Sequence, residues 1–99
     1  MRFRFKTEKL KELYTLEKNE AKYPSAVVDR FFDVMSVITY ANDERDLYSL
    51  RSLHFEKLKG EREGQRSLRL NKQWRLIVIL EVNEEGKVLL ILDIENHYR

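Results

Sequence analysis

The sequence contains no cysteine, one proline, three glycines and two histidines among its 99 residues. Without cysteine the chain can form neither a disulfide bond nor a thiolate metal site, and two histidines do not supply a histidine-rich site. We therefore expect no cofactor and no metal. No window approaches the roughly 18 consecutive apolar residues that span a bilayer, and the N-terminal stretch MRFRFKTEKLKELY lacks the apolar core of a signal peptide. The sequence thus predicts a cytoplasmic protein with no membrane association.

The apolar residues of the chain are numerous enough to form one hydrophobic core. Apolar residues make up 42% of the chain and charged residues 36%, a balance typical of soluble globular proteins and unlike that of disordered ones. A chain of this length suffices for one core and not for two, so we expect a single domain over residues 1–99.

The first half shows a short strand followed by helical spacing. Residues 1–5 alternate between charged and apolar side chains, which predicts a half-buried strand at or near a sheet edge. From Thr7, a predicted N-cap, apolar residues recur at helical spacing until Pro24, which is expected to end this first helix. The apolar side of that helix is predicted to comprise Leu10, Leu13, Tyr14 and Ala21.

A second, stronger helix is predicted after Pro24, with Ser25 as its cap. Its core-facing residues recur at steps of three and four, and this spacing assigns its aromatic residues to the core rather than to base stacking: they are Val27, Val28, Phe31, Phe32, Met35, Ile38 and Ala41. Residues 43–50 form one or two further turns with Leu47, Tyr48 and Leu50 directed inward.

The second half changes to strand spacing. Arg66, Leu68 and Leu70 share one strand face, residues 74–81 read as a largely buried strand containing Trp74, and residues 87–95 return after a hairpin turn at Glu84–Gly86. These elements predict an α+β fold in which an N-terminal helical hairpin packs on a three- to five-stranded, mainly antiparallel sheet.

The positive charge of the chain is concentrated in one window. Residues 51–75 hold eight of the 19 lysines and arginines and three acidic residues, whereas the first 50 residues are balanced and the last 24 are acidic. Arginine and lysine suit phosphate oxygens, and Gly60 and Gly64 let the loop backbone approach a ligand. The window therefore predicts a polyanion-binding surface, although the same charges also fit a solvated strand face. Its candidate residues are Lys57, Lys59, Arg62, Arg66, Arg69 and Arg75.

Two further places carry groups that transfer protons. The C-terminal tail holds Asn96, His97 and Tyr98 directly after a buried strand that pairs with the strand of Arg75, so these residues are expected to meet the basic window. His54 precedes the window, and its position gives it a structural role more readily than a functional one.

The run KLKGEREGQRSLRLNKQWRLIV from Lys57 to Val78, followed by a hairpin and the terminal DIENHYR, resembles the RelE/ParE superfamily of bacterial toxins. It is most similar to the plasmid-maintenance killer, or HigB-like, branch. That branch shows an LKG loop, a G-x-x-S-[IL]-R-[IL]-N-x-Q-W-R strand and a terminal [DE]-[YH]-[YH] tail. The resemblance covers essentially the whole chain and implies a RelE-like fold.

The resemblance also implies a function: a toxin of a type II toxin–antitoxin pair that cleaves messenger RNA in the ribosomal A site, without a cofactor. Lys59 and Arg75 then stabilise the transition state, and His97 and Tyr98 transfer protons. From the charge pattern we expect the RNA or ribosome to be bound by Lys57, Arg62, Arg66 and Arg69, together with Asn96 of the tail. The implied partners are the 70S ribosome, its mRNA and a helix-turn-helix (HigA-like) antitoxin, through which alone the toxin meets operator DNA.

Two departures from the family pattern stand out. Many members have a histidine three residues before the loop lysine, where this chain has Glu56, and His54 is displaced by two positions. The usual Asp-Tyr-His tail reads Asn-His-Tyr here. Two other functions stay open on sequence alone: a ParE-type gyrase inhibitor that acts by protein binding without RNA cleavage, and an inert or degenerate member of the family.

Overall fold

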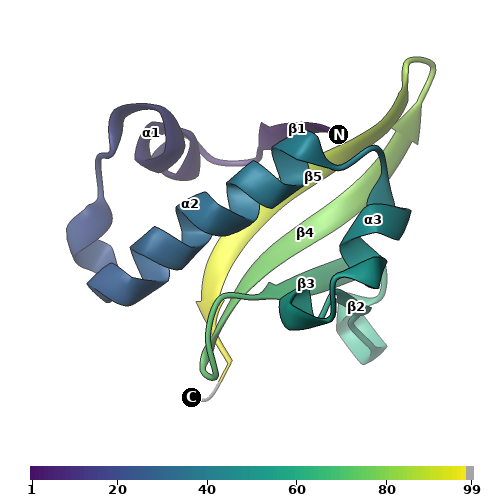
Figure 1. The fold of residues 1–99 in the computed structure, drawn as a ribbon. Helices are drawn as coiled ribbons and strands as arrows, with labels where there is room; N and C mark the ends of the chain where they lie inside the picture. The colour runs from purple at the N-terminus through teal and green to yellow at the C-terminus, as the bar shows by residue number, and fades with distance from the viewer. Residues whose placement is uncertain (98–99) are drawn as a thin grey trace.

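The computed structural model describes residues 1–97. It consists of a five-stranded sheet with helices packed against it (Figure 1). The strands are β1 (Arg2–Phe5), β2 (Glu56–Lys57), β3 (Gln65–Arg69), β4 (Trp74–Asn83) and β5 (Gly86–Asn96), and the helices are α1 (Glu8–Leu16), α2 (Ser25–Tyr40) and α3 (Glu44–Ser49). Short 3₁₀ helices span Glu20–Lys22, Arg51–Leu53 and Gly60–Arg62. No helix within residues 1–97 is long and apolar enough to cross a membrane.

The sheet has the order β1-β5-β4-β3-β2. β1 pairs with β5 in parallel, and all other pairs are antiparallel, so the predicted edge position of residues 1–5 and the mainly antiparallel α+β fold are confirmed. β4 and β5 meet in a two-residue hairpin at Glu84 and Glu85, followed by Gly86 with a φ of +110°. Glycine suits that backbone conformation because it has no Cβ.

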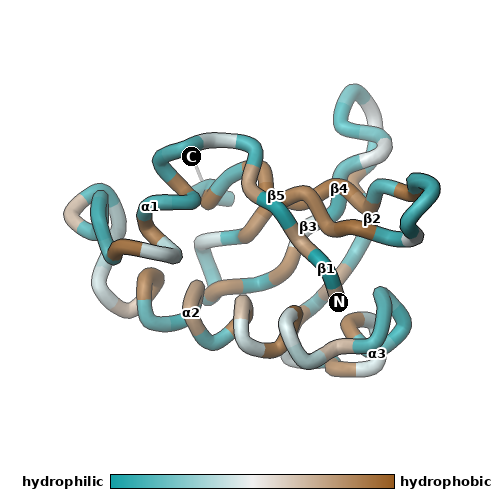
Figure 2. Tube along the Cα trace, turned by 90° about the horizontal axis from the view of Figure 1, so that it is seen from above, coloured by the Kyte–Doolittle hydropathy of each residue, from teal (hydrophilic) through white to brown (hydrophobic). Residues whose placement is uncertain are grey.

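The core lies between the sheet and α2, which crosses one sheet face (Figure 1). The apolar segments gather in β4, β5 and α2, while the loops are hydrophilic (Figure 2). Tyr14 of α1 joins the layers, because its ring packs against Phe3 and Phe5 of β1 and against Phe31 and Phe32 of α2, with centroids 5.4–6.4 Å apart. The predicted core positions of α2 are buried, except that Phe32 is half-buried.

A bulge in β5 decides which side chains face the core. The β4–β5 register shifts between Ile77 and Val78, so that Ile77 pairs with Asp93 and Val78 with Ile91. An extra residue in one strand reverses the alternation of side chains beyond it. Ile91 and Ile94, three positions apart, are therefore both buried in the core, and Glu95 faces the opposite side of the sheet.

The first helix ends earlier than predicted. Thr7 is its N-cap, as expected, and accepts a hydrogen bond from the Leu10 N–H at 3.3 Å. However, α1 stops at Leu16, because Glu17 and Asn19 both adopt left-handed conformations with φ of 55° and 69°. Ala21 lies in a separate 3₁₀ helix and is exposed, so its assignment to the apolar side of the helix was wrong.

Two other local predictions were wrong. Pro24, not Ser25, is the N-cap of α2, and its carbonyl oxygen accepts the N–H groups of Val27 and Val28. A proline fits there because its missing N–H needs no partner at a helix start. Leu47 is buried as expected, but Tyr48 and Leu50 are 43% and 44% exposed, since the six-residue helix α3 turns only one side to the core.

Candidate nucleic-acid interface

A row of charged residues crosses three strands on the sheet face opposite the core. Arg69 of β3 pairs with Arg75 of β4, and Arg75 pairs with Glu95 of β5. Directly paired residues point to the same side of a sheet. Their chain neighbours Leu68, Leu76 and Ile94 form the matching row on the other side, where all three are buried. The burial of this apolar row therefore fixes the direction of the charged one.

The two arginines converge on the turn between β3 and β4. The Asn71 carbonyl oxygen accepts Arg75 Nη1–H at 2.7 Å and Arg69 Nε–H at 3.3 Å. The Asn71 side-chain oxygen accepts the backbone N–H groups of Gln73 and Trp74, each at 2.8 Å, which fixes the turn. Arg75 uses only Nη1 for its hydrogen bonds within the described chain, so Nε and Nη2 face no protein acceptor there. An anion at this turn can be bound by both guanidinium groups.

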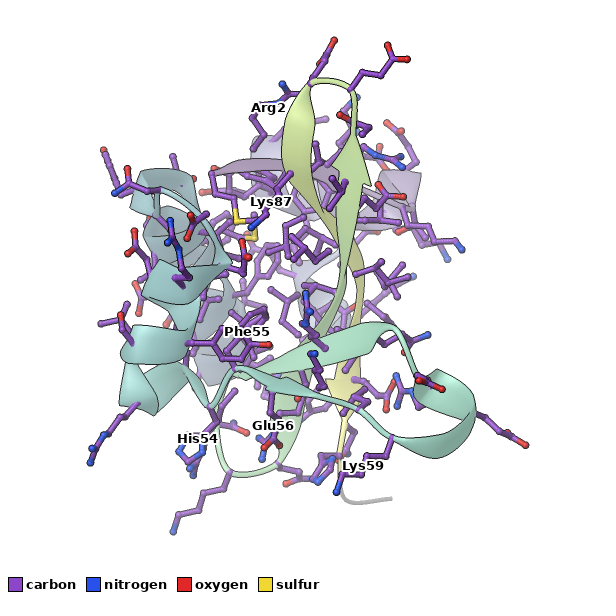
Figure 3. All side chains as sticks on the ribbon, turned by 90° about the vertical axis from the view of Figure 1, so that its right-hand side faces the viewer. Arg2, His54, Phe55, Glu56, Lys59 and Lys87 are labelled. Atoms are coloured by element: carbon purple, nitrogen blue, oxygen red, sulfur yellow. The ribbon has the colours of Figure 1, made fainter. Side chains whose placement is uncertain are left out.

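His54 joins this cluster, which the sequence did not predict. Its Nε2 lies 3.3 Å from Arg69 Nη1. The residue ends the 3₁₀ helix Arg51–Leu53 in a left-handed conformation with φ 45° and ψ 48°, which is uncommon for a residue with a Cβ. The exposed side chain of His54 lies at the same end of the molecule as Glu56 and Lys59 (Figure 3). In the sequence, the one indication of a role for His54 was its position next to the basic residues that begin at Lys57.

Glu56 also belongs to this region. It pairs with Ser67 of β3, two residues before Arg69, and therefore points to the same sheet side as the arginine row. Its side chain is exposed. Glu56 stands three residues before Lys59, so a carboxyl side chain lies on the same sheet side as the arginines, close in the chain to the loop lysine.

A second group of basic residues lines a hollow of about 640 Å³ beneath the β2–β3 loop. Lys57, Lys59 and Arg66 contribute to its walls, together with Gly60 and Gly64. Gly60 and Gly64 have φ of +69° and +94°, a backbone conformation that favours glycine. A Cβ would meet open space at both positions, so the backbone conformation and not crowding accounts for glycine there. The Arg66 guanidinium lies 5.9 Å from the Phe55 ring centre in a cation–π arrangement. Arg66 thus points to the opposite sheet side from Arg69.

Arg62 is held by an ion pair. Its guanidinium donates two hydrogen bonds to the Glu95 carboxylate, at 2.6 and 2.9 Å, and a third to Gln65 at 3.0 Å. The hydrogen bonds that Arg62 donates to the Glu95 carboxylate raise the pKa of Arg62 above its usual value. The ion pair joins the β2–β3 loop to β5. It also neutralises much of the positive charge of Arg62, a residue that the sequence analysis expects to bind RNA.

The C-terminal tail reaches the same turn as the two arginines. Asn96 pairs with Trp74, and the His97 N–H donates to the Gln73 carbonyl oxygen at 2.6 Å. Tyr98, the other residue expected to transfer a proton, lies outside the described residues. The structure therefore brings Arg69, Arg75, His54 and the backbone of His97 to one end of the sheet, whereas Lys57, Lys59 and Arg66 surround the neighbouring hollow.

No group of three or more histidine, aspartate and glutamate side chains within residues 1–97 is arranged to hold a metal ion. The chemistry open to the described site is that of guanidinium, ammonium, imidazole and carboxylate groups.

Solved structures of other proteins share this fold. A YoeB/ParE toxin from Agrobacterium tumefaciens superimposes with a TM-score of 0.60 at 17% identity, over 99% of this chain and all of the toxin. The toxin–antitoxin complex RelE–RelB from Pyrococcus horikoshii gives a TM-score of 0.57 at 23% identity, over 99% of this chain and 96% of the solved one. The chain has the RelE-like toxin fold.

Sequence comparison is more specific. Residues 3–95 match the family model of the RelE-like toxin of type II toxin–antitoxin system HigB. Toxin HigB-1 of Vibrio cholerae is 34% identical over 77 residues, which cover 78% of this chain and 81% of that toxin. The chain belongs to the HigB-like family of type II toxin–antitoxin toxins, which confirms the family expected from its motifs.

Proposed function

We propose that this toxin is a ribosome-dependent endoribonuclease that stops translation by cleaving messenger RNA without a metal ion. The observation that carries the proposal is the convergence of Arg69 and Arg75 on the β3–β4 turn, with His54 and the backbone of His97 beside them. Two guanidinium groups suited to a phosphate and an imidazole group thus lie at one end of the sheet, which supports the proposal.

The proposed reaction uses the nucleophile that RNA itself provides. The 2′-hydroxyl beside the scissile bond attacks phosphorus and forms a new P–O bond, while the bond to the 5′-oxygen breaks. One enzyme group takes the 2′-hydroxyl proton and another gives a proton to the leaving 5′-oxygen. The products are a 2′,3′-cyclic phosphate and a 5′-hydroxyl, so neither water nor a redox partner is consumed.

Arg75 and Lys59 stabilise the negative charge that develops on the phosphoryl oxygens. Arg75 is supported by its own hydrogen bond to Asn71, which holds the guanidinium in place before RNA arrives. Lys59 approaches from the wall of the hollow as an exposed point charge. His97 and Tyr98 are the proposed proton-transfer residues, and Lys57, Arg66, Arg69 and Asn96 bind the RNA or ribosomal backbone. Arg62 assists from its ion pair with Glu95.

The proposed partners are the 70S ribosome with its mRNA, and an antitoxin. Solved structures of similar fold include a YoeB–YefM complex from Staphylococcus aureus and the RelE–RelB complex, which supports an antitoxin partner for this chain. A helix-turn-helix antitoxin would also carry the toxin to operator DNA. Such a toxin acts in the cytoplasm, where ribosomes and mRNA are found.

The test is cleavage of a defined mRNA on programmed 70S ribosomes, mapped by primer extension, with wild-type protein, Arg75→Ala and the control Lys72→Ala. Lys72 is an exposed lysine of the same turn. We expect Arg75→Ala to lose at least about 100-fold in cleavage rate, with an unchanged melting temperature, because an interaction specific to the transition state is removed. Lys72→Ala should cleave normally.

A parallel assay of DNA supercoiling by gyrase separates the two toxin activities that this fold supports. Inhibition of supercoiling by the wild-type protein without mRNA cleavage would replace the proposed reaction with gyrase inhibition.

A further inference from the structure

An apolar groove lies between the C-terminal half of α2 and α3. Its volume is about 500 Å³. Tyr40 of α2 and Leu50, the residue after α3, both line the groove and are 87% and 44% exposed. The groove is lined by Val37, Tyr40, Ala41, Leu50, Asp46 and small serine side chains.

The groove gathers exposed apolar surface. Five large apolar side chains are exposed within residues 1–97, and two of them, Tyr40 and Leu50, line the groove. A third, Tyr48 of α3, packs instead against the ring of Phe55. The other two, Leu16 and Val82, lie at the end of α1 and near the β4–β5 hairpin. A tyrosine on the rim of an apolar groove is the kind of residue that dominates binding energy in protein interfaces.

The residues that line the groove do not favour RNA as its occupant, and of the nearby exposed arginines Arg45 is paired with Asp43 and Arg51 lies outside the lining. None of its described lining residues is a lysine or arginine, and Asp46 places a carboxylate in the wall. Asp29 and Asp33, both exposed, precede Val37 by two turns and one turn along the same stripe of α2. The complementary occupant is a protein segment with apolar side chains next to a lysine or arginine.

A second copy of this chain fits less well. A two-fold symmetric dimer places the same patch on both sides of the interface. Asp33 and Asp46 of each copy would then face the acidic residues of the other, which opposes association. A different protein with basic residues meets no such repulsion.

We propose that this groove is the docking site of the antitoxin, through a segment that carries apolar residues flanked by lysine or arginine. This assignment rests on the proposed function, which supplies an antitoxin. The α2–α3 junction lies toward the N-terminal end of the sheet in Figure 1, away from the β3–β4 turn and the C-terminus. The antitoxin therefore holds the toxin at a surface separate from the arginine row. The 3₁₀ helix Arg51–Leu53 connects Leu50 of the groove directly to His54 of the site.

The test measures binding of the purified protein encoded by the reading frame next to this one, by calorimetry. The variants are Tyr40→Asp, Asp33→Lys and, as a matched control, Leu16→Asp. Leu16 is also an exposed apolar residue, at 59%, and it ends α1, which lies on the other side of α2 from α3 (Figure 1). We expect Tyr40→Asp to weaken binding about 30-fold or more, as for an interface tyrosine that contributes much of the binding energy. Asp33→Lys should weaken it about 3- to 10-fold, less so in high salt, and Leu16→Asp should bind like the wild type.

Three outcomes would overturn the proposal. The first is wild-type affinity in both groove variants, with melting temperatures showing that they are folded. The second is a dimer of the toxin alone that Tyr40→Asp converts to a monomer, which makes a second copy the occupant. The third is the absence of any complex with the wild-type toxin. Ribosomal mRNA cleavage by Tyr40→Asp, measured in parallel, reports on the proposed reaction independently, because Tyr40 takes no part in it.

Discussion

Arg69 Nη1 lies 3.3 Å from Nε2 of His54. A guanidinium group has only donors, so a hydrogen bond in this contact runs from Arg69 to Nε2 of the imidazole. His54 thereby holds the guanidinium beside the β3–β4 turn from one side, while the Asn71 carbonyl oxygen holds it from the other. The contact depends on an unusual backbone, since His54 has a φ of 45°.

Replacing His54 separates the role of its ring from the role of its backbone. His54→Ala and His54→Gly both remove the acceptor for Arg69, and we expect each to lower mRNA cleavage about tenfold, the effect of losing roughly 1.4 kcal/mol of a charged hydrogen bond. Glycine adopts positive φ without strain, so His54→Gly should be more stable than His54→Ala by about 1 kcal/mol. Denaturant unfolding and ribosomal cleavage are the two measurements.

His54→Gln provides the matched variant, because its side-chain oxygen can still accept from Arg69. It should recover part of the cleavage activity. Full activity in both the alanine and glycine variants would show that His54 does not position Arg69.

The ion pair between Arg62 and Glu95 should show measurable coupling. It is bidentate, and its side chains are 39% and 22% exposed. A double-mutant cycle with Arg62→Ala and Glu95→Ala is expected to give a coupling free energy of about 0.5–1 kcal/mol by denaturant unfolding.

The exposed pair Arg2–Glu85, with side chains 55% and 73% exposed, is the control and should give less than about 0.3 kcal/mol. Equal coupling in the two pairs would contradict the idea that the Arg62 contact fixes the loop.

Acid should remove a contribution of Asp43 to stability. Hydrogen bonds from the Arg45 side chain and backbone hold the pKa of Asp43 at about 2, below its usual 3.8. A lowered pKa in the folded state stabilises the fold above the unfolded pKa, and this stabilisation is lost as the pH falls toward 2. Asp43→Asn keeps an N-cap for α3 but removes the charge.

The variant should therefore be less stable than the wild type at pH 7, and the difference should shrink below about pH 4. Thermal unfolding between pH 2 and pH 7 provides the measurement. A difference that stays constant over this range would rule out ionisation of Asp43 as its cause.

The tail should control the chemical step. His97→Ala and Tyr98→Phe remove proton-transfer groups, and each is expected to lower the cleavage rate on ribosomes about 10²- to 10⁴-fold while leaving ribosome binding unchanged. Substitution is preferable to deletion, because the His97 backbone N–H bonds to Gln73 and a truncation would also remove this contact. Loss of one limb of the pH–rate profile would identify which residue acts as acid or base. Unchanged cleavage in both variants would move proton transfer to His54 or Glu56.

Features set by periodicity or by a sequence motif were predictable. The alternation of Phe3 and Phe5, the three- and four-residue spacing of Val27 to Ile38 and the hairpin at Gly86 each define an element, and together they lead to the α+β fold. The motif from Lys57 to Val78 led to the toxin family, because its characteristic residues follow one another within a single short segment of the sequence.

Features that depend on tertiary contacts were not predictable. The early end of α1 follows from left-handed conformations at Glu17 and Asn19, which leave no apolar pattern. The bulge in β5 places Glu95 on the sheet side where it pairs with Arg62. The alternation of apolar and polar residues in the sequence does not indicate where this bulge lies. The approach of His54 to Arg69 joins residues 15 positions apart through a backbone conformation that is rare for histidine. The roles assigned to Lys59, Arg75, His97 and Tyr98 remain predictions.

The parallel pairing of β1 with β5 also determines when the fold can form. Arg2 pairs with Val88 and Phe5 with Ile91, so the sheet closes only when segments more than 80 residues apart in the chain meet. Contacts between segments so far apart form slowly, because closing the long loop between them costs entropy. During synthesis, β1 is made before β5 and has no partner strand until β5 has also been made. A partly made chain thus carries the basic window before it carries a completed sheet, because β3 and β4 precede β5 in the chain.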